Sequence, residues 1–248
     1  MSERIAVVTG GTGTIGTEIC KHLANGGYRV VALCLPGMPD CQLEGWEAAR
    51  ASEGFVMHAR GCNVADFEDT AATLKKIEAE IGPISALVNA AGITRDAPLR
   101  KMTPQQWREV LSANLDSVFN TTRCVIEGMM EHGFGRIVNI SSVNGQKGQF
   151  GQANYAASKA GMHGVTMSVA REGALKGVTC NTVSPGYIES PMIMAVPEEH
   201  RAKIVAEIPV GRFGKPTEIG RLVAFLAAEE SAFITGADIS INGGQHMG

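Results

Sequence analysis

The sequence predicts an α/β fold, a single domain over residues 1–248 with a doubly wound, seven-stranded parallel sheet. Short β-branched segments alternate with longer amphipathic segments along the chain, which is the pattern of successive strand–helix–strand units. Several short segments are apolar almost throughout, as expected of strands that helices cover on both faces. A chain of 248 residues can form one large domain of this class, and no linker or repeat divides it.

The expected elements follow one another at regular intervals. Seven segments have the length and composition of buried strands: Arg4–Thr9, Arg29–Cys34, Phe55–Arg60, Ala86–Asn89, Arg136–Ser141, Thr179–Ser184 and Ile239–Asn242. Helices are expected between them: Ile15–Asn25, Phe67–Ile81, Pro104–Glu131, Ala153–Leu175 and Pro216–Ala228. Residues Tyr187–Val210 break this alternation and contain several prolines. We expect this insertion to form a lid over a site at the carboxyl edge of the sheet; the alternative is an ordinary surface excursion.

The composition excludes several classes of protein. Lys and Arg total 22 and Asp and Glu total 25, so the formal net charge is −3 and the basic footprint of a nucleic-acid binder is missing. No apolar run approaches the ~20 residues that span a bilayer, and the first strand begins too early for a signal peptide. The 6 cysteines form no CxxC pair and the 6 histidines form no metal-ligand cluster. We therefore expect reduced thiols, no metal and a cytoplasmic protein.

A glycine-rich turn follows the first strand directly. Gly11, Gly13 and Gly16 fit the pattern G-x-G-x-x-G between a strand and a helix. Glycine lets the backbone approach a pyrophosphate, and the N-terminus of the following helix offers free N–H donors. This context predicts a Rossmann-like dinucleotide site. The alternative is that the glycines only close a tight turn.

The second strand ends without the acidic residue that usually binds the ribose 2′-hydroxyl of NAD. It also lacks a partner for the 2′-phosphate of NADP, because no Arg or Lys occurs between Val30 and Ala49. Asp40 is the first charged residue after this strand, and its carboxylate would repel a phosphate if it faced the cofactor. The sequence therefore favours NADH over NADPH, with Arg29 or a residue distant in sequence as the alternative source of positive charge.

Tyr155 and Lys159 lie on one face of a predicted helix, because they are four residues apart. A free tyrosine has a pKa near ~10, and a neighbouring ammonium group favours its phenolate. Such a pair can deliver a proton to an alkoxide. Taken alone, this spacing is common by chance, and a solvated helix face is then the favoured interpretation.

Two further polar residues support a catalytic site. Ser142 stands at the end of the strand that contains Ser141, at the sheet edge where this fold binds ligands, and its hydroxyl can bind a carbonyl oxygen. Asn114 lies within a predicted helix, although asparagine has a low helix propensity. We expect Asn114 to hold a relay water; the alternative is a local kink or a hydrogen bond between helices.

Together these residues resemble the short-chain dehydrogenase/reductase family along the whole chain. The matching segments are Thr9–Gly16, Asn89–Gly92, Asn114, Ser142, Tyr155, Lys159 and Pro185–Gly186. The resemblance implies a catalytic tetrad of Asn114, Ser142, Tyr155 and Lys159. In it, the tyrosine is the acid, the serine polarises the carbonyl, and the lysine binds the nicotinamide ribose and lowers the pKa of the tyrosine. The resemblance also implies a homotetramer.

The same resemblance implies which residues contact the cofactor: Gly11, Thr12, Gly13, Thr14, Ile15, Gly16, Leu35, Cys62, Asn63, Val64, Asn89, Ala90, Ala91, Gly92, Tyr155, Lys159, Pro185, Gly186, Ile188 and Ser190. Four of them depart from the family's usual pattern. Thr14 replaces a glycine, Ala90 an asparagine, Asn63 an aspartate that meets the adenine, and Ser190 a threonine that contacts the carboxamide. These departures concern cofactor affinity and preference rather than the tetrad.

Three segments resemble more closely the branch of the family that reduces acetoacetyl-CoA to (R)-3-hydroxybutanoyl-CoA for polyhydroxybutyrate synthesis: Gly92–Asp96, Ser141–Gln152 and Asn242–Gly248. In that branch, the substrate pocket is lined by the counterparts of Asp96, Ser142, Gln149, Phe150, Gln152 and Tyr187. Amide groups and an aromatic ring suit a short polar thioester. The alternative for Gln149 and Gln152 is that they are ordinary polar loop residues.

Two other functions fit the sequence as well. A 3-oxoacyl-(acyl carrier protein) reductase of fatty-acid synthesis shares the Gly92–Asp96 stretch and needs a basic patch for its carrier protein. Four residues are candidates for that patch: Arg95, Arg100, Lys101 and Arg136. A dinucleotide-sensing binding protein would use the fold without catalysis, but it has no reason to contain Ser142, Tyr155 and Lys159 together.

Overall fold

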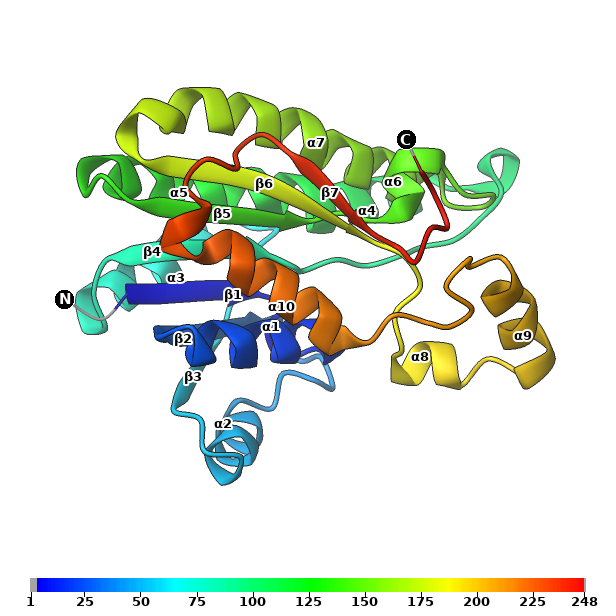
Figure 1. The fold of residues 1–248 in the computed structure, drawn as a ribbon, viewed down its shortest axis with the longest axis horizontal. Coiled ribbons are helices and arrows are strands. Elements are labelled where there is room, and N and C mark those ends of the chain that lie inside the picture. The colour runs from blue at the N-terminus through cyan, green and yellow to red at the C-terminus, as the bar shows by residue number, and fades with distance from the viewer. Residues whose placement is uncertain (1–3, 248) are drawn as a thin grey trace.

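Seven parallel strands form one sheet in the computed structural model, which describes residues 4–247 (Figure 1). Their order across the sheet is β3-β2-β1-β4-β5-β6-β7. The strands are β1 (Arg4–Thr9), β2 (Tyr28–Cys34), β3 (Met57–Gly61), β4 (Ile84–Asn89), β5 (Gly135–Ile140), β6 (Val178–Pro185) and β7 (Asp238–Ile241). Each predicted strand overlaps one of these, so the predicted doubly wound α/β fold is confirmed.

The strand order creates a crevice near the middle of the sheet. From β1 the chain builds β2 and β3 on one side, and it then returns to build β4 to β7 on the other side. The connections that leave the carboxyl ends of β1 and β4 therefore diverge, and open α/β sheets bind their ligands at such a point. Thr9 of β1 pairs with Asn89 of β4 at this edge.

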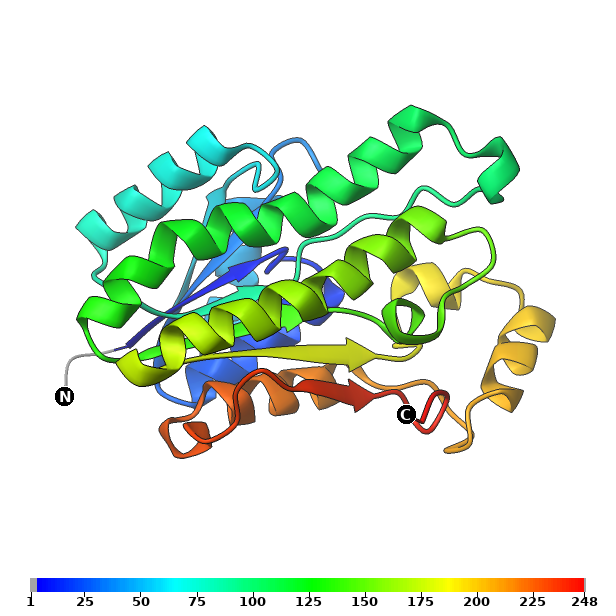
Figure 2. The ribbon, with the colours of Figure 1, turned by 90° about the horizontal axis from the view of Figure 1, so that it is seen from above.

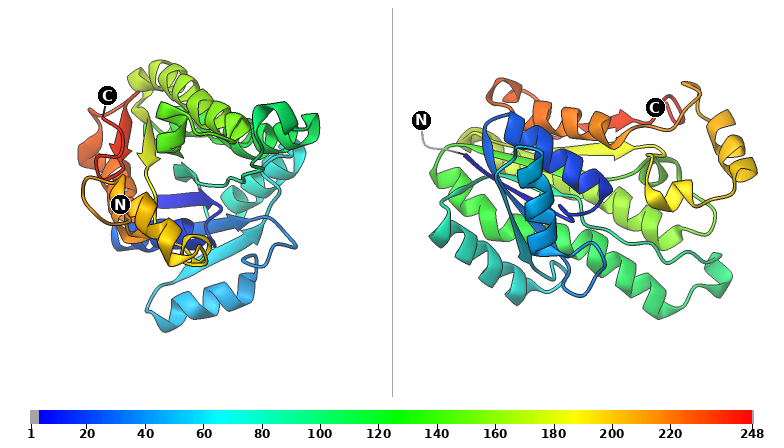
Figure 3. Two further views of the ribbon diagram at one scale, coloured as in Figure 1. Left: turned by 90° about the vertical axis from the view of Figure 1, so that its right-hand side faces the viewer. Right: turned by 90° about the horizontal axis from the view of Figure 1, so that it is seen from below.

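Helices cover both faces of the sheet (Figures 2 and 3). α1 (Thr14–Asn25), α2 (Leu43–Ser52) and α10 (Pro216–Ala227) pack on one face. α3 (Phe67–Glu80), α5 (Ser117–Glu131) and α7 (Ala153–Gly173) pack on the other. The remaining helices are short: α4 (Pro104–Leu111), α6 (Val143–Lys147), α8 (Pro191–Met194) and α9 (Glu198–Ala206). Single helical turns complete the fold: η1 (Leu99–Lys101), η2 (Ser112–Asp116), η3 (Ala174–Lys176) and η4 (Glu229–Ser231).

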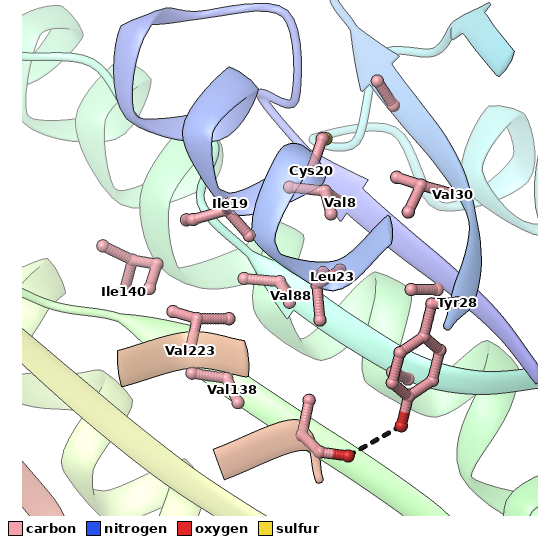
Figure 4. Close-up of a cluster of buried hydrophobic side chains, with 14 of the residues drawn as sticks. Val8, Ile19, Cys20, Leu23, Tyr28, Val30, Val88, Val138, Ile140 and Val223 are labelled. Atoms are coloured by element: carbon pink, nitrogen blue, oxygen red, sulfur yellow. Dashed lines mark hydrogen bonds between the residues drawn. The ribbon is translucent and has the colours of Figure 1, made fainter. Parts of the chain in front are cut away.

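Two apolar cores form because successive side chains of a strand point to opposite faces. Val8 of β1 belongs to the core beneath α1 and α10, with Leu23, whereas its neighbour Val7 belongs to the core beneath α3 and α5. Figure 4 shows the first core, where the Tyr28 hydroxyl donates a hydrogen bond of 2.7 Å to the carbonyl oxygen of Ala227. This bond ties the end of α10 to the start of β2.

The predicted helix Pro104–Glu131 is interrupted. α4 ends at Leu111, a π-helical turn follows over Ser112–Asp116, and α5 starts at Ser117. The turn contains Asn114, whose low helix propensity was the one sequence signal here. π-helical turns are rare and occur frequently at functional sites.

The expectation of reduced thiols is wrong for one pair of cysteines. Cys34 and Cys41 form a disulfide with a Cα–Cα distance of 5.3 Å, whereas Cys20, Cys62, Cys124 and Cys180 are free. The pair has no CxxC spacing; it meets because two tight turns fold the intervening segment back. In these turns the Met38 N–H bonds the Leu35 carbonyl at 3.2 Å and the Cys41 N–H bonds the Met38 carbonyl at 2.9 Å.

The insertion at residues 187–210 forms α8 and α9, which extend beyond the carboxyl edge of the sheet (Figure 1). α8 begins at Pro191, and the Ser190 hydroxyl caps it by accepting a hydrogen bond of 3.3 Å from the Ile193 N–H. Over residues 4–247, no helix is both long enough and apolar enough to cross a membrane.

Candidate active site and cofactor cleft

α7 presents the phenol and the amine of the predicted catalytic pair on one face. The Nζ atom of Lys159 lies 5.6 Å from the centre of the Tyr155 ring. Lys159 is only 3% exposed, and its amine donates a hydrogen bond of 2.7 Å to the carbonyl oxygen of Ile140 at the end of β5. The structure therefore places both groups at the carboxyl edge of the sheet.

Ser142 reaches this pair from β5. It is the N-cap of α6, where its Oγ atom accepts a hydrogen bond of 3.1 Å from the Asn144 N–H. Its hydroxyl is also hydrogen-bonded to the side chain of Tyr155. Three of the four predicted catalytic side chains thus meet within one site.

Burial dominates the titration of the pair. It raises the pKa of Tyr155 above its ordinary value, while the Ser142 hydrogen bond lowers this pKa and the Asp96 carboxylate raises it. Burial also lowers the pKa of Lys159 to about 7. The expected lowering of the tyrosine pKa by the lysine is therefore not the net effect in this structure, because an amine with such a pKa is only partly charged at neutral pH. The phenol is therefore protonated at neutral pH.

The side chain of Asn114 is bound to protein groups. Its Oδ1 atom accepts a hydrogen bond of 2.7 Å from the Ile93 N–H, and its Nδ2 atom donates to the Ile93 carbonyl at 3.0 Å and to the Ser158 hydroxyl at 3.2 Å. Both features of the alternative interpretation are therefore present, an irregular helix and a bond to another helix. Asn114 is nevertheless close to the pair, since a Cβ on Gly92 would lie 3.3 Å from its Oδ1 atom and 3.4 Å from the Lys159 Nζ atom.

The turn between β1 and α1 has the close packing that its glycines predict. A Cβ on Gly11 would lie 2.7 Å from the Cβ of Ala32, so no larger residue fits against β2. Gly10, which the sequence analysis did not single out, has a φ of +61° and so also requires glycine. Between them and α1, Thr12 is 8% exposed, and its buried hydroxyl has no hydrogen-bond partner within residues 4–247.

A cavity of about 140 Å³ lies against this turn. Predicted cofactor residues line it together with parts of the loop after β2: Thr12, Leu35, Met38, Asp40, Cys62, Asn63, Val64, Ala91 and Gly92. Asp40 supplies the only charged side chain of the lining in the described part of the chain. One carboxylate oxygen of Asp40 lies 3.5 Å from the position that a Cβ on Gly13 would occupy. The carboxylate therefore lies beside the glycine-rich turn.

A wider groove of about 600 Å³ continues along the other side of the turn toward α10. Thr12, Gly13 and Thr14 line it from the turn, and Glu189 and Lys215 line it from the segments that follow β6 and precede α10. Pro185, Gly186 and Ile188 stand at the end of β6, close to this groove in sequence. At this end of β6, the Gly186 N–H donates a hydrogen bond of 3.1 Å to the Ile241 carbonyl.

Asn89 lies in the sheet interior and not in the cavity. Its Nδ2 atom donates a hydrogen bond of 2.8 Å to the side-chain oxygen of Asn139. The Asn139 amide donates one of 2.8 Å to the Thr166 hydroxyl, and this hydroxyl is hydrogen-bonded to the Thr182 hydroxyl at 2.8 Å. This buried polar chain links β4, β5, α7 and β6. The following residues reach the turn after β1, because the N–H groups of Ala90 and Ala91 both donate to the Thr9 hydroxyl at 3.0 Å.

The predicted substrate residues separate into two groups. Gln152 donates a hydrogen bond of 2.8 Å to the Asp96 carboxylate and accepts one of 2.9 Å from Asn144, whose own N–H donates to Ser142. Burial, Glu207 and Asp96 raise the pKa of Tyr187, which lines a separate cavity with Ile188 and Ile208. Gln149 and Phe150, by contrast, are exposed, and the ring of Phe150 is 85% accessible.

Comparison with known proteins gives the family. A model of the short chain dehydrogenase family matches residues 4–201. The chain belongs to the short-chain dehydrogenase family. It is 54% identical to an acetoacetyl-CoA reductase of Cupriavidus necator over 100% of both chains, and 53% identical to one of Allochromatium vinosum over 98% of this chain and 99% of that one. It is 43% identical to a 3-oxoacyl-[acyl-carrier-protein] reductase of Vibrio harveyi over 98% of both chains.

A nicotinamide dinucleotide is the cofactor of short-chain dehydrogenases, and the cleft of this one fits such a molecule. The glycine-rich turn admits a backbone approach that larger residues would block, and α1 begins there with an N-terminus that no side chain caps. The unpaired hydroxyl of Thr12 offers a hydrogen bond that the protein itself does not satisfy. Among residues 4–247, no group of three or more His, Cys, Asp or Glu side chains is placed to hold a metal ion.

Two buried asparagines of this short-chain dehydrogenase were missed by the sequence analysis. The Asn154 side chain donates 3.1 Å bonds to the carbonyls of Arg95 and Gln106 and accepts one of 2.8 Å from the Tyr155 N–H, so it fixes the start of α7. Asn144 carries a buried amide oxygen without a partner in the described chain, beside the substrate residues. Nothing in their spacing distinguishes them from ordinary loop residues, because Asn154 binds carbonyls distant in sequence and Asn144 binds a side chain across a loop.

Proposed function

We propose that this short-chain dehydrogenase reduces the 3-keto group of acetoacetyl-CoA to (R)-3-hydroxybutanoyl-CoA, in the cytoplasm, as a step of polyhydroxybutyrate synthesis. The observation that carries the proposal is the meeting of Tyr155, Ser142 and Lys159 beside a dinucleotide cleft. The choice of substrate is supported by relatives named acetoacetyl-CoA reductase, which match the whole chain at 54% and 53% identity.

In the proposed mechanism, the bound nicotinamide cofactor supplies the hydride to the keto carbon. Ser142 donates a hydrogen bond to the keto oxygen and polarises it. Tyr155 transfers its phenolic proton to that oxygen as negative charge develops there. An alkoxide is a stronger base than a phenolate, so a tyrosine whose pKa is raised by burial still donates. Lys159, whose amine lies 5.6 Å from the centre of the Tyr155 ring, would hold the ribose of the cofactor and return a proton toward Tyr155. We assign the relay water to the backbone of the turn at Asn114.

We assign the acyl end of the substrate to the side of the site that contains Asp96, Gln152 and Tyr187. Their amide, carboxylate and phenol groups favour a short, polar acyl chain over a long apolar one. Gln149 and Phe150 are exposed in this structure. We infer that they contact the substrate when the loop before α7 closes, and that α8 and α9 act as the lid.

We infer that NADH is preferred over NADPH. The support is the lining of the cavity. Among the described residues that form this lining, Asp40 supplies a carboxylate and none supplies a basic side chain. A carboxylate accepts hydrogen bonds from ribose hydroxyls but repels a 2′-phosphate.

Reduction of carrier-bound acyl groups is the second candidate, supported by the Vibrio harveyi relative. Arg100 and Lys101 are exposed in η1 and suit an acidic carrier protein. Arg136 does not belong to this patch, because it is 2% exposed and its guanidinium donates to the carbonyls of Ala228, Gly177 and others at the opposite edge of the sheet.

The experiment that separates these functions compares kcat/KM for acetoacetyl-CoA with kcat/KM for a C8 3-oxoacyl group on acyl carrier protein. We expect the CoA thioester to be preferred; a strong preference for the carrier-bound C8 chain would refute the main proposal. Tyr155→Phe tests catalysis itself. We expect this variant to bind the cofactor normally and to lose at least about 100-fold in turnover. A dinucleotide sensor would reduce no acyl substrate, either as the wild type or as Tyr155→Phe.

We also propose a homotetramer. Phe67 and Phe119, on α3 and α5, stack with ring centres 6.3 Å apart although both are exposed. Exposed apolar rings that stack across two helices are typical of an interface between subunits. Light scattering of the purified protein tests the stoichiometry.

A further inference from the structure

The loop after β2 contains a carboxylate that the end of the strand itself lacks. In the usual dinucleotide fold, an acidic residue at the end of the second strand binds the adenosine ribose. Here that strand ends at Cys34, followed by Leu35 and Pro36. Asp40 comes six positions after Cys34 in the sequence, yet it lines the cavity and lies beside Gly13 of the glycine-rich turn. Asp40 therefore supplies the cavity with the acidic side chain that the end of β2 does not provide.

The disulfide determines where this loop lies. Cys34 is buried at the end of β2, and its bond to Cys41 fixes both ends of the segment that carries Asp40. Pro36 packs on β3, since a Cβ on Gly61 would lie 3.0 Å from its ring. The side chain of Asp40 itself is exposed, so the covalent closure, rather than burial, restricts its position. Without the bond, the loop has more conformations available.

A second, independent group in the cavity points to a ligand. The hydroxyl of Thr12 is buried and unpaired within the described chain, and Thr12 lines the same cavity as Asp40. A buried polar atom without a partner is costly unless a ligand or water satisfies it. A carboxylate and a hydroxyl that line one cavity suit a vicinal diol, which offers two O–H donors and two acceptors.

We propose that the Cys34–Cys41 disulfide controls cofactor selectivity by holding the Asp40 carboxylate where it binds the adenosine ribose diol of NADH and repels the 2′-phosphate of NADPH. This proposal rests on the NADH preference proposed above and identifies its determinant. Disulfides are uncommon in reducing compartments and are often redox-sensing there, so the selectivity of this enzyme depends on the thiol redox state. A dithiol supplies two electrons and two protons; the S–S bond breaks, two thiols form, and the dithiol is oxidised to its own disulfide.

The test measures dissociation constants for NADH and NADPH by nicotinamide fluorescence, without acyl substrate. For the oxidised wild type we expect NADH to bind at least about 10-fold more tightly than NADPH. Asp40→Asn should bring the two constants within about 3-fold of each other. Glu44→Gln, which removes the same charge from an exposed position on α2, should leave the ratio unchanged.

The disulfide is tested with dithiothreitol and with Cys41→Ser. Both should lower the NADH-to-NADPH selectivity by about 3-fold or more, and the variant should no longer respond to dithiothreitol. Cys124→Ser, which removes a free thiol, is the matched control. Thiol titration of the denatured protein should find the 4 free cysteines before reduction and all 6 after it.

The outcomes separate the proposals. An unchanged selectivity in Asp40→Asn, or in both Cys41→Ser and the reduced wild type, overturns this inference while the NADH preference stands. Six thiols in the unreduced protein also overturn it. A wild type that prefers NADPH overturns the inference and the NADH preference together. Failure to reduce acetoacetyl-CoA affects the proposed substrate alone, because binding is measured without it.

Discussion

Lys159 should make the folded protein less stable near neutral pH, and Lys159→Met should remove this cost. Burial lowers the pKa of this lysine from the ordinary value of 10.5 to about 7. Between these pH values the unfolded chain binds a proton that the folded chain does not bind, so the stability of the wild type rises with pH across this window. At ~1.4 kcal/mol per pH unit, the cost near pH 7 is about 4 kcal/mol.

Methionine has a similar length and no charge, so the variant avoids this cost but leaves the Ile140 carbonyl without its 2.7 Å hydrogen bond. That loss costs about 1–3 kcal/mol. We therefore expect Lys159→Met to be more stable than the wild type by about 1–3 kcal/mol at pH 7, to lose this advantage as the pH approaches 10, and to be nearly inactive.

Urea unfolding followed by circular dichroism at pH 7 and at pH 9.5 measures the effect. Lys75→Met is the control, because Lys75 is exposed on α3 and its removal should change the stability little at either pH. A variant that is less stable than the wild type at pH 7, or a stability difference that does not change with pH, would contradict the argument that the amine is buried and largely desolvated.

Three further predictions concern the phenol and the core. Ser142→Ala removes a hydrogen bond that lowers the pKa of Tyr155, so the alkaline limb of the kcat/KM profile for reduction should move to higher pH, with a lower rate. Asp96→Asn removes a carboxylate that raises this pKa, so the same limb should move to lower pH; equal profiles for both variants would refute the assignment of the limb to Tyr155. Tyr28→Phe leaves the buried carbonyl of Ala227 without its partner and should lower the free energy of unfolding by about 1–3 kcal/mol, measured in urea, with unchanged kcat.

The sheet could be predicted because its signals are local. The segment Arg4–Thr9 is apolar almost throughout and is bounded by a glycine-rich turn, and the structure gives β1 those same bounds. The break at Asn114 and the helix around Trp46 were less accessible. The side chain of Trp46 is buried by tertiary packing and donates a 3.0 Å hydrogen bond to the Thr17 hydroxyl. A local sequence pattern cannot predict this contact, because the two residues are distant in sequence.

In the site, the helical spacing of Tyr155 and Lys159 fixed their common face, and the strand end fixed Ser142 at the same edge. The direction of the tyrosine pKa could not be obtained in this way. Spacing indicates that an amine is near a phenol, but the balance between charge and burial depends on the packing of α6 and β5 over both groups. The position of Asp40 was equally inaccessible, because it depends on a covalent bond between cysteines that have no recognisable motif.

The buried chain from Asn89 through Asn139 and Thr166 to Thr182 limits how this enzyme can be redesigned. Each of these side chains is hydrogen-bonded to the next. Replacing one of them by an apolar residue therefore leaves a buried polar group of its neighbour without a hydrogen-bond partner. Engineering for thermal tolerance should therefore treat these positions as one block, exchanged together or left alone. Single substitutions should be tolerated better in the loops at the carboxyl edge of the sheet than in this buried chain of hydrogen bonds.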